Sequence, residues 1–223
     1  RGEYVSTFKI PDLRHKPLSI LHVDSNCVVV DKLPNLLSVA GREVADCVVA
    51  RVRELFPYAK GPISVHRLDM ETSGLMVLAL RRDAHRHLSL QFEERNVAKT
   101  YTALLEGRVK DDEGHIELGF SLDWPNRPRH IYDTESRKVG ITDWQVLERY
   151  DNATRVLFKP LTGRTHQLRL HASHELGMGH PVIGDSLYGN PDLADRLMLH
   201  STTLAFNHPH SGERLSFEMP APF

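Results

Sequence analysis

One segment constrains this chain more than any other: the run from Ser64 to Gly74, followed by the apolar stretch from Leu75 to Leu80. It places one carboxylate, Asp69, in a short turn-forming segment directly before a predicted buried strand. An acid at the end of a rigid strand is held in place and still open to a ligand, as catalysis requires. We therefore expect a sheet with Asp69 at the end of one of its strands.

The composition is that of an ordinary globular protein of 223 residues, with 40% hydrophobic and 26% charged residues. A sizeable core is therefore available. No apolar run approaches the roughly 18 residues that span a bilayer, and no signal segment opens the sequence. Two cysteines in apolar surroundings, Cys27 and Cys47, are expected to be buried free thiols in a reducing cytoplasm.

The chain contains no internal repeat and no clear linker. Residues 1–17 are polar with two prolines and predict an N-terminal arm, and residues 18–223 predict a single domain. Hydrophobic spacing predicts helices over 46–56, 83–95 and 165–176, strands over 28–30, 75–80, 100–105, 144–147 and 155–158, a long loop or hairpin over 123–140, and a final hairpin over 204–217. Strands far outnumber βαβ units, so we expect an α+β fold with a mainly antiparallel central sheet flanked by helices.

Three segments hold side chains suited to chemistry: His66–Asp69, Lys99–Tyr101 and Gly163–His171. Each also has a purely structural interpretation. An aspartate beside an arginine in a turn is often a cap or a surface ion pair, and a tyrosine in a strand usually packs in the core. Thr165 could cap the helix predicted at 165–176. None of the three segments decides the function alone.

Together these segments resemble the RluA family of RNA pseudouridine synthases, from about Leu21 to Phe223. The shared pieces are Val29–Lys32, Leu36–Val39, His66–Leu80, Lys99–Ala103, Arg164–His171, Gly179–Asp185 and Leu197–His200. Asp123–Pro128 resembles the dual-specificity branch, which modifies both 23S ribosomal RNA and transfer RNA. The resemblance implies the pseudouridine synthase fold. The additional S4-type domain of other branches is not expected, because the chain is too short for one.

The resemblance implies that Asp69 is the catalytic carboxylate of a reaction that breaks the uridine N1–C1′ bond, turns the base and rejoins it through C5. No cofactor is required, since no atom is gained and no redox step occurs. An ionised carboxylate could attack C1′, add to the ring or remove a ribose proton, and the sequence leaves all three open. Arg169 matches the arginine that pairs with this aspartate. Tyr101 matches the active-site tyrosine that stacks on uracil, with proton transfer also open. Leu199 matches the apolar residue that closes the pocket.

The partner implied is structured RNA, with the target base swung out of its stem-loop. In the family the arginine of the His-Arg-Leu-Asp motif, here Arg67, fills the vacated space. A basic loop with interleaved aromatic residues suggests an RNA clamp, although it could be merely a solvated loop. The predicted RNA-binding residues are Trp124, Arg127, Arg129, Arg137, Lys138 and Arg164. We expect no membrane or DNA partner, and a monomer, because no exposed apolar seam is evident.

Fourteen histidines raise the question of a metal, and His166, His171, His174 and His180 crowd one region. No cysteine or paired carboxylate completes a set of ligands there, so we expect no bound metal. A metal-dependent phosphoesterase remains one alternative function. The other alternative is an RNA-binding module without chemistry.

Overall fold

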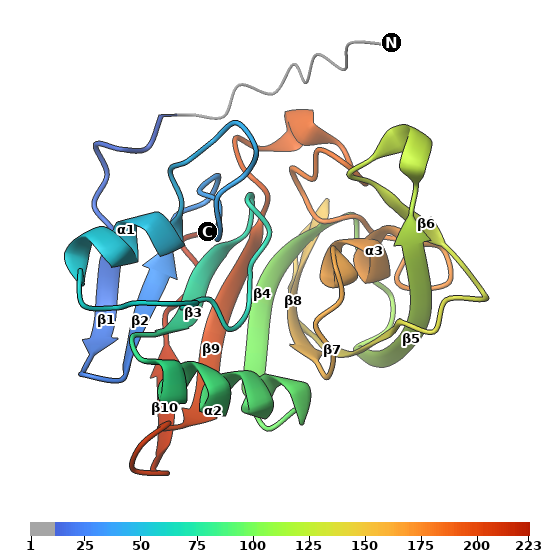
Figure 1. The fold of residues 1–223 in the computed structure, drawn as a ribbon. Coiled ribbons are helices and arrows are strands. Elements are labelled where there is room, and N and C mark those ends of the chain that lie inside the picture. Colours follow the sequence, from blue (N-terminus) through green and yellow to red (C-terminus); the bar gives the residue numbers. More distant parts are fainter. Residues whose placement is uncertain (1–11) are drawn as a thin grey trace.

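A computed structural model describes residues 12–223 of the chain (Figure 1). Its strands are β1 (Ser19–Val23), β2 (Cys27–Lys32), β3 (Ser73–Ala79), β4 (Ala98–Glu106), β5 (Glu113–Leu122), β6 (His130–Tyr132), β7 (Val139–Arg149), β8 (Ala153–Pro160), β9 (Leu199–Asn207) and β10 (Arg214–Glu218). The α-helices are α1 (Val48–Leu55), α2 (Arg82–Glu93) and α3 (Gln167–Ser173), and two 3₁₀ turns are η1 (Trp124–Asn126) and η2 (Pro191–Leu193). Among the described residues, no helix has the length and apolar character needed to span a membrane.

All ten strands belong to one sheet in the order β1-β2-β3-β9-β4-β8-β7-β5-β6, with β10 paired to β9. Every pairing is antiparallel except that of β3 with β9. The predicted α+β fold with a mainly antiparallel sheet is therefore confirmed. Strand β9, which comes late in the sequence, lies between β3 and β4 and joins the two halves of the sheet.

The parallel junction of β3 with β9 is short, with Ser73 opposite His200 and Gly74 opposite Ser201. Gly74 has a φ of +113°, and a Cβ at this position would run into the backbone of Ser201. Both the backbone conformation and the close approach therefore require glycine. Gly74 is the last residue of the run from Ser64 that contains Asp69.

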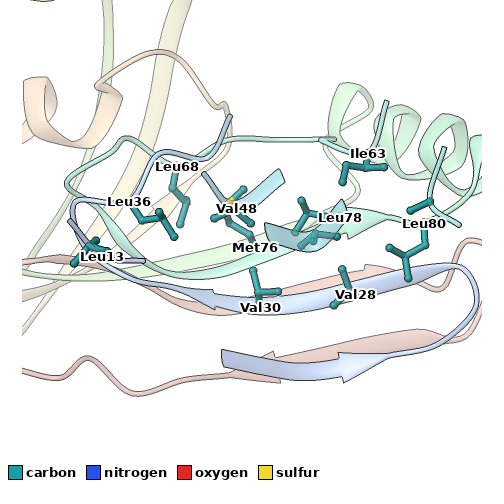
Figure 2. Close-up of a cluster of buried hydrophobic side chains, with 12 residues drawn as sticks. Leu13, Val28, Val30, Leu36, Val48, Ile63, Leu68, Met76, Leu78 and Leu80 are labelled. Atoms are coloured by element: carbon teal, nitrogen blue, oxygen red, sulfur yellow. The ribbon is translucent and has the colours of Figure 1, made fainter. Parts of the chain in front are cut away.

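Helices flank the sheet on both faces, as alternation along its strands dictates. On β2, Val28 and Val30 face the cluster that contains Val48 and Val52 of α1, whereas Val29 faces the cluster of α2. Figure 2 shows the first of these clusters, with Leu68 and Leu80 toward opposite ends. The third helix, α3, lies inside the curve formed by β8, β7 and β5 (Figure 1). Because Leu68 is anchored in the core, the neighbouring Asp69 has a fixed position.

Several boundaries differ from the predictions. Helix α3 covers only residues 167–173, and Leu176, the last residue of the predicted helix, is 57% exposed. Thr165 makes no capping hydrogen bond, and His166 precedes the helix in a left-handed conformation with φ of +53°. The region 123–140 contains η1 and β6, and β6 forms a hairpin with β5, a strand that the sequence did not predict.

Of the predicted arm, residues 1–11 lie outside the described part of the chain, and Leu13 packs into the cluster of Figure 2. Both cysteines are buried free thiols, as predicted. Burial, with the nearby Asp24 carboxylate as a smaller cause, raises the pKa of the Cys27 thiol to about 12. This thiol is therefore protonated and unreactive at neutral pH.

Candidate active site

A cavity of 1150 Å³ opens between the segment before β3, strand β4 and the loop that precedes α3. Its lining includes six residues that the sequence assigned to a site: Arg67, Asp69, Tyr101, Arg164, Arg169 and Leu199. These residues are far apart in the chain and come from both halves of the sheet. The cavity exists because β9 brings the two halves together, with Leu199 at the start of that strand.

The backbone around Asp69 is fixed by a polar side chain from the loop between β2 and α1. The Ser38 hydroxyl donates to the carbonyl of Leu68 at 2.7 Å and accepts from the Leu68 N–H at 3.1 Å. The carbonyl of Asp69 accepts from the N–H of Thr72 at 3.1 Å, which closes the turn. The Asp69 side chain remains 28% exposed and so is open to a ligand.

Lys32 also stabilises this turn, through a hydrogen bond to the Met70 carbonyl. Its ammonium group is fully buried and donates to three carbonyls, those of Leu33 at 2.8 Å, Leu36 at 2.7 Å and Met70 at 2.8 Å. Burial lowers its pKa to about 7, although the Asp69 charge acts in the opposite direction. In the same loop Asn35 adopts φ of +66°, a left-handed conformation that asparagine tolerates better than most residues.

Arg169 lies at the centre of a buried network of charges and is only 2% exposed. It donates to both oxygens of Asp185, from Nε at 2.9 Å and from Nη2 at 2.6 Å. Its Nη2 also lies 2.7 Å from Glu71, and its Nη1 lies 3.7 Å from Oδ2 of Asp69. Burial alone would lower the pKa of Arg169, but the hydrogen bonds and the surrounding carboxylates raise it above its ordinary value. The guanidinium is therefore a permanent cation beside Asp69.

Tyr101 lines the same cavity as Asp69. On β4 it pairs with Ser201 of β9 and with Phe158 of β8, and its ring packs against the hydrophobic clusters of both halves of the sheet. Burial raises the pKa of its phenol well above 10, and the charge of Asp69 adds to this effect, whereas the hydrogen bond with Ser201 opposes it. The hydroxyl is therefore a neutral donor.

Two histidines of the cavity are fixed in their neutral forms. Nε2 of His66 accepts the N–H of Val77 at 3.0 Å, and the ring stacks on Phe92 with centroids 4.5 Å apart. Burial lowers the pKa of His66 to about 3. His166 lies 2.7 Å from the Tyr188 hydroxyl through Nδ1, and burial lowers its pKa to about 4. His166 is therefore a structural contact of the cavity rather than a cation.

The predicted RNA-binding loop lies at the rim, where Pro128 lines the cavity. Trp124 is 67% exposed, and the Arg127 guanidinium lies 5.4 Å from its ring centre. Arg129 donates to the carbonyl of Leu187 and lies over the Tyr188 ring at 5.3 Å. Arg137 and Lys138 are exposed and, like the rest of this loop except Pro128, lie outside the cavity lining.

Sequence reasoning missed the partners that hold these residues. Asp185 and Glu71 each lie inside a segment that resembles the family, but no feature of the sequence marks either acid as a partner of Arg169. The four histidines considered for a metal do not come together as a ligand group. Within residues 12–223 the group with suitable spacing is His22, Asp24 and Cys27, where Asp24 already accepts hydrogen bonds from two histidines.

Comparison with known proteins identifies the family. Residues 26–174 match the family model described as RNA pseudouridylate synthase. The chain is 45% identical over 210 residues to the dual-specificity RNA pseudouridine synthase RluA of Yersinia pestis, covering 92% of this chain and 99% of that protein. It is 43% identical to the RluA of Escherichia coli K12, covering 92% and 94% of the two chains.

A solved structure agrees with this assignment. The structure titled Human RNA Pseudouridylate Synthase Domain Containing 1 superposes with a TM-score of 0.76 at 33% identity, covering 92% of this chain and 84% of that one. The matches support neither a metal-dependent phosphoesterase nor a non-catalytic RNA-binding module. With a family model over most of the chain and relatives above 40% identity, this chain belongs to the RluA family of RNA pseudouridine synthases and is an isomerase.

Proposed function

We propose that this enzyme converts specific uridines to pseudouridine in a hairpin loop of 23S ribosomal RNA and in the anticodon stem-loop of transfer RNA. The observation that carries this proposal is the position of Asp69, an accessible carboxylate 3.7 Å from a buried arginine at an open cavity. The relatives from Y. pestis and E. coli named as dual-specificity enzymes support the choice of two RNA classes.

Asp69 is the proposed catalytic carboxylate. Cleavage of N1–C1′ frees the uracil, rotation presents C5 to C1′, and the new C–C bond forms as the C5 proton leaves and N1 gains a proton. Attack on C1′, addition to the ring and removal of a ribose proton all need an ionised carboxylate. Arg169, with Nη1 3.7 Å from Oδ2 of Asp69, orients this carboxylate. Asp185 and Glu71 act through Arg169, because they prevent its guanidinium from turning away.

Tyr101 and Leu199 are proposed to contact the uracil. The Tyr101 ring offers a stacking surface of the kind that contributes roughly 1–3 kcal/mol per base, and its neutral hydroxyl can donate a hydrogen bond. Leu199 is 3% exposed and supplies an apolar wall. Arg67 is exposed at the mouth of the cavity, as a residue that fills the space left by a flipped base must be.

The loop that carries Trp124, Arg127, Arg129, Arg137 and Lys138 is proposed to clamp the RNA outside the cavity, with Arg164 at its edge. Exposed aromatic rings with interleaved cations suit unpaired bases and their phosphates. We infer that the enzyme works as a monomer in the cytoplasm, without a metal, a cofactor or a DNA partner.

The test is tritium release. The protein and its Asp69→Asn variant are incubated with transfer RNA and with 23S RNA fragments labelled with tritium at uridine C5, because bonding at C5 must expel that hydrogen. The expected result is release by the parent and none by the variant, with both RNA classes responding. Release from neither RNA by the parent would overturn the proposed substrates, and unchanged release by the variant would overturn the role of Asp69.

A further inference from the structure

Lys99 is a cation of the cavity that has no assigned role so far. Lys99 of β4 lines the cavity two residues before Tyr101, and its side chain is partly buried. Within residues 12–223 its ammonium group has neither a carboxylate nor a hydrogen-bond acceptor as partner. Lys32, the other lysine buried at this site, donates to three carbonyls. Lys99 is thus a partly buried cation without an internal partner.

The position of Lys99 is set by the alternation of β4. Thr100 and Thr102 point to the opposite face, where they line a separate groove, so Lys99 and Tyr101 share the cavity face. Two residues along a strand span about 7 Å. The Lys99 ammonium lies against Gly163, where a built Cβ would be 3.6 Å from Nζ. The next residue in that loop, Arg164, is a second cation of the cavity lining.

A charge in this position costs free energy until an anion joins it. Lysine is almost never buried without a partner, and burial lowers the pKa of Lys99 below its ordinary value because no carboxylate opposes the desolvation. An RNA substrate carries anions of this kind. A flipped nucleotide enters with a phosphate on each side of its ribose, and lysine binds phosphate as a compact point charge.

We propose that Lys99 is a phosphate-binding residue that takes one of the two RNA phosphates flanking the flipped uridine, with Arg164 as the second cation of the subsite. The inference rests on the proposed function, since it places the uracil against Tyr101. With the base stacked there, a four-carbon side chain that starts about 7 Å away along β4 reaches the backbone of the same nucleotide. This contact would fix the ribose relative to Asp69.

The first experiment measures RNA affinity in the Asp69→Asn background, where no turnover occurs, over a series of salt concentrations. Lys99→Gln is expected to lower affinity about tenfold and to reduce the slope of log K against log salt by about 0.7–0.9, the effect of one lost phosphate contact. Lys99→Arg should restore both values. Lys110→Gln removes an exposed lysine outside the cavity lining and is the matched control, with no change in either value.

The second experiment identifies the phosphate. A single neutral methylphosphonate replaces the linkage on the 5′ or the 3′ side of the target uridine. At one of these linkages the methylphosphonate should lower the RNA affinity of the protein with Lys99 about tenfold. The same methylphosphonate should leave the affinity of Lys99→Gln unchanged, because that protein has already lost the contact. The proposal is wrong if, at both linkages, the methylphosphonate lowers the RNA affinity of Lys99→Gln by the same factor as that of the Lys99 protein. It is also wrong if Lys99→Gln binds RNA as tightly as Lys110→Gln does.

These outcomes are separate from the fate of the proposed function. If the parent releases tritium but the methylphosphonate and Lys99→Gln lower RNA affinity independently of each other, only the proposed role of Lys99 is wrong. Failure of the parent to release tritium from any RNA would remove the proposed function itself. Thermal unfolding of Lys99→Gln should occur at no lower temperature than that of the parent, because the substitution removes a partly buried charge that lacks a partner. A lower unfolding temperature would show that Lys99 is structural and would also overturn the proposal.

Discussion

Asp185 accepts two hydrogen bonds from Arg169, at Oδ2 from Nε (2.9 Å) and at Oδ1 from Nη2 (2.6 Å). Neither side chain is more than 2% exposed. Asp185 is itself fixed by the N–H groups of Leu187 at 2.9 Å and Tyr188 at 3.2 Å. The guanidinium plane therefore cannot rotate, and Nη1 is left as the edge that faces Asp69. The Asp69 carboxylate, which we propose to be catalytic, is oriented by a residue 116 positions further along the chain, through the side chain of Arg169.

Asp185→Asn should therefore weaken both the fold and the reaction. The substitution breaks a buried, bidentate ion pair, and breaking such a pair costs about 3–5 kcal/mol in the free energy of unfolding. Urea unfolding measures this loss, and Asp195→Asn, an exposed site in the following segment, is the control. In tritium-release assays kcat should fall far more than KM changes. An unchanged kcat would show that Arg169 does not need this orientation.

Asp69→Asn should abolish turnover while RNA binding survives. The substitution preserves shape and removes the charge that every proposed route requires, so we expect the rate of tritium release to fall by about a thousandfold or more. RNA affinity should stay within about twofold, because phosphate contacts supply most of it. Parallel loss of binding and turnover would instead indicate that Asp69 is structural.

The Tyr101 hydroxyl should stay protonated across the working range of the enzyme. Burial and the charge of Asp69 raise the pKa of this phenol above its ordinary value of 10. Titration of tyrosine absorbance in the parent and in Tyr101→Phe should give identical curves up to about pH 10. A tyrosine that ionises below that pH in the parent alone would contradict the buried, neutral hydroxyl described here.

Single substitutions in the clamp loop should separate RNA contacts from structural ones. Arg137 is exposed, so Arg137→Ala should lower RNA affinity and its salt dependence without affecting thermal unfolding. Arg129 donates to the Leu187 carbonyl, so Arg129→Ala should lower the unfolding temperature as well. If the triple alanine variant at Arg127, Arg129 and Arg137 keeps the RNA affinity of the parent and its salt dependence, the proposal that this loop clamps RNA is wrong.

Stability should fall as the pH drops below about 6.5, in part because of His200. Its Nε2 donates to the Met219 carbonyl at 3.0 Å and its Nδ1 lies 2.7 Å from the Ser73 hydroxyl. Burial, with the nearby charge of Arg196 as a smaller cause, lowers its pKa from 6.5 to about 4. Below pH 6.5 the unfolded chain binds a proton that the folded chain excludes, so stability present above that pH is lost as the pH falls toward about 4. The full effect is about 3 kcal/mol.

Urea unfolding of the parent and of His200→Gln between pH 7.5 and pH 4.5 measures this contribution. Glutamine can keep one donor and one acceptor but does not titrate, so the variant should lose less stability on acidification than the parent does. His210→Gln, at an exposed turn, is the matched control. Equal pH dependence in the parent and in His200→Gln would show that His200 is protonated without cost.

Local patterns predicted the strands and helices that carry strong hydrophobic periodicity. Buried runs such as Leu75–Leu80 and the stacked residues of 83–95 gave β3 and α2 within a few positions. Strand β5 was missed because Glu113–Leu122 alternates weakly and holds two glycines, and it owes its pairing to β7. The end of α3 was misplaced because apolar spacing continues to Leu176, whereas the chain turns after Ser173.

Contacts between residues far apart in the chain could not be predicted from local sequence patterns either. The resemblance indicated Asp69, Tyr101, Arg169 and Leu199, and the fold brings these residues to one cavity. The residues that hold Arg169 could not be derived, since a long-range ion pair leaves no periodic signal in the sequence. Asp185 and Glu71 are ordinary acids until the sheet places them against one buried guanidinium.

The order of the strands also fixes when in synthesis this enzyme can begin to work. Asp69 belongs to the half of the sheet that ends with β3, and Tyr101 belongs to the half that begins with β4, so the two halves stay unconnected until β9 is inserted between them. A ribosome-bound chain therefore has no complete cavity before residues 199–207 have left the exit tunnel. A nascent chain halted earlier would carry Asp69 and Tyr101 but would leave the RNA of its own ribosome unmodified.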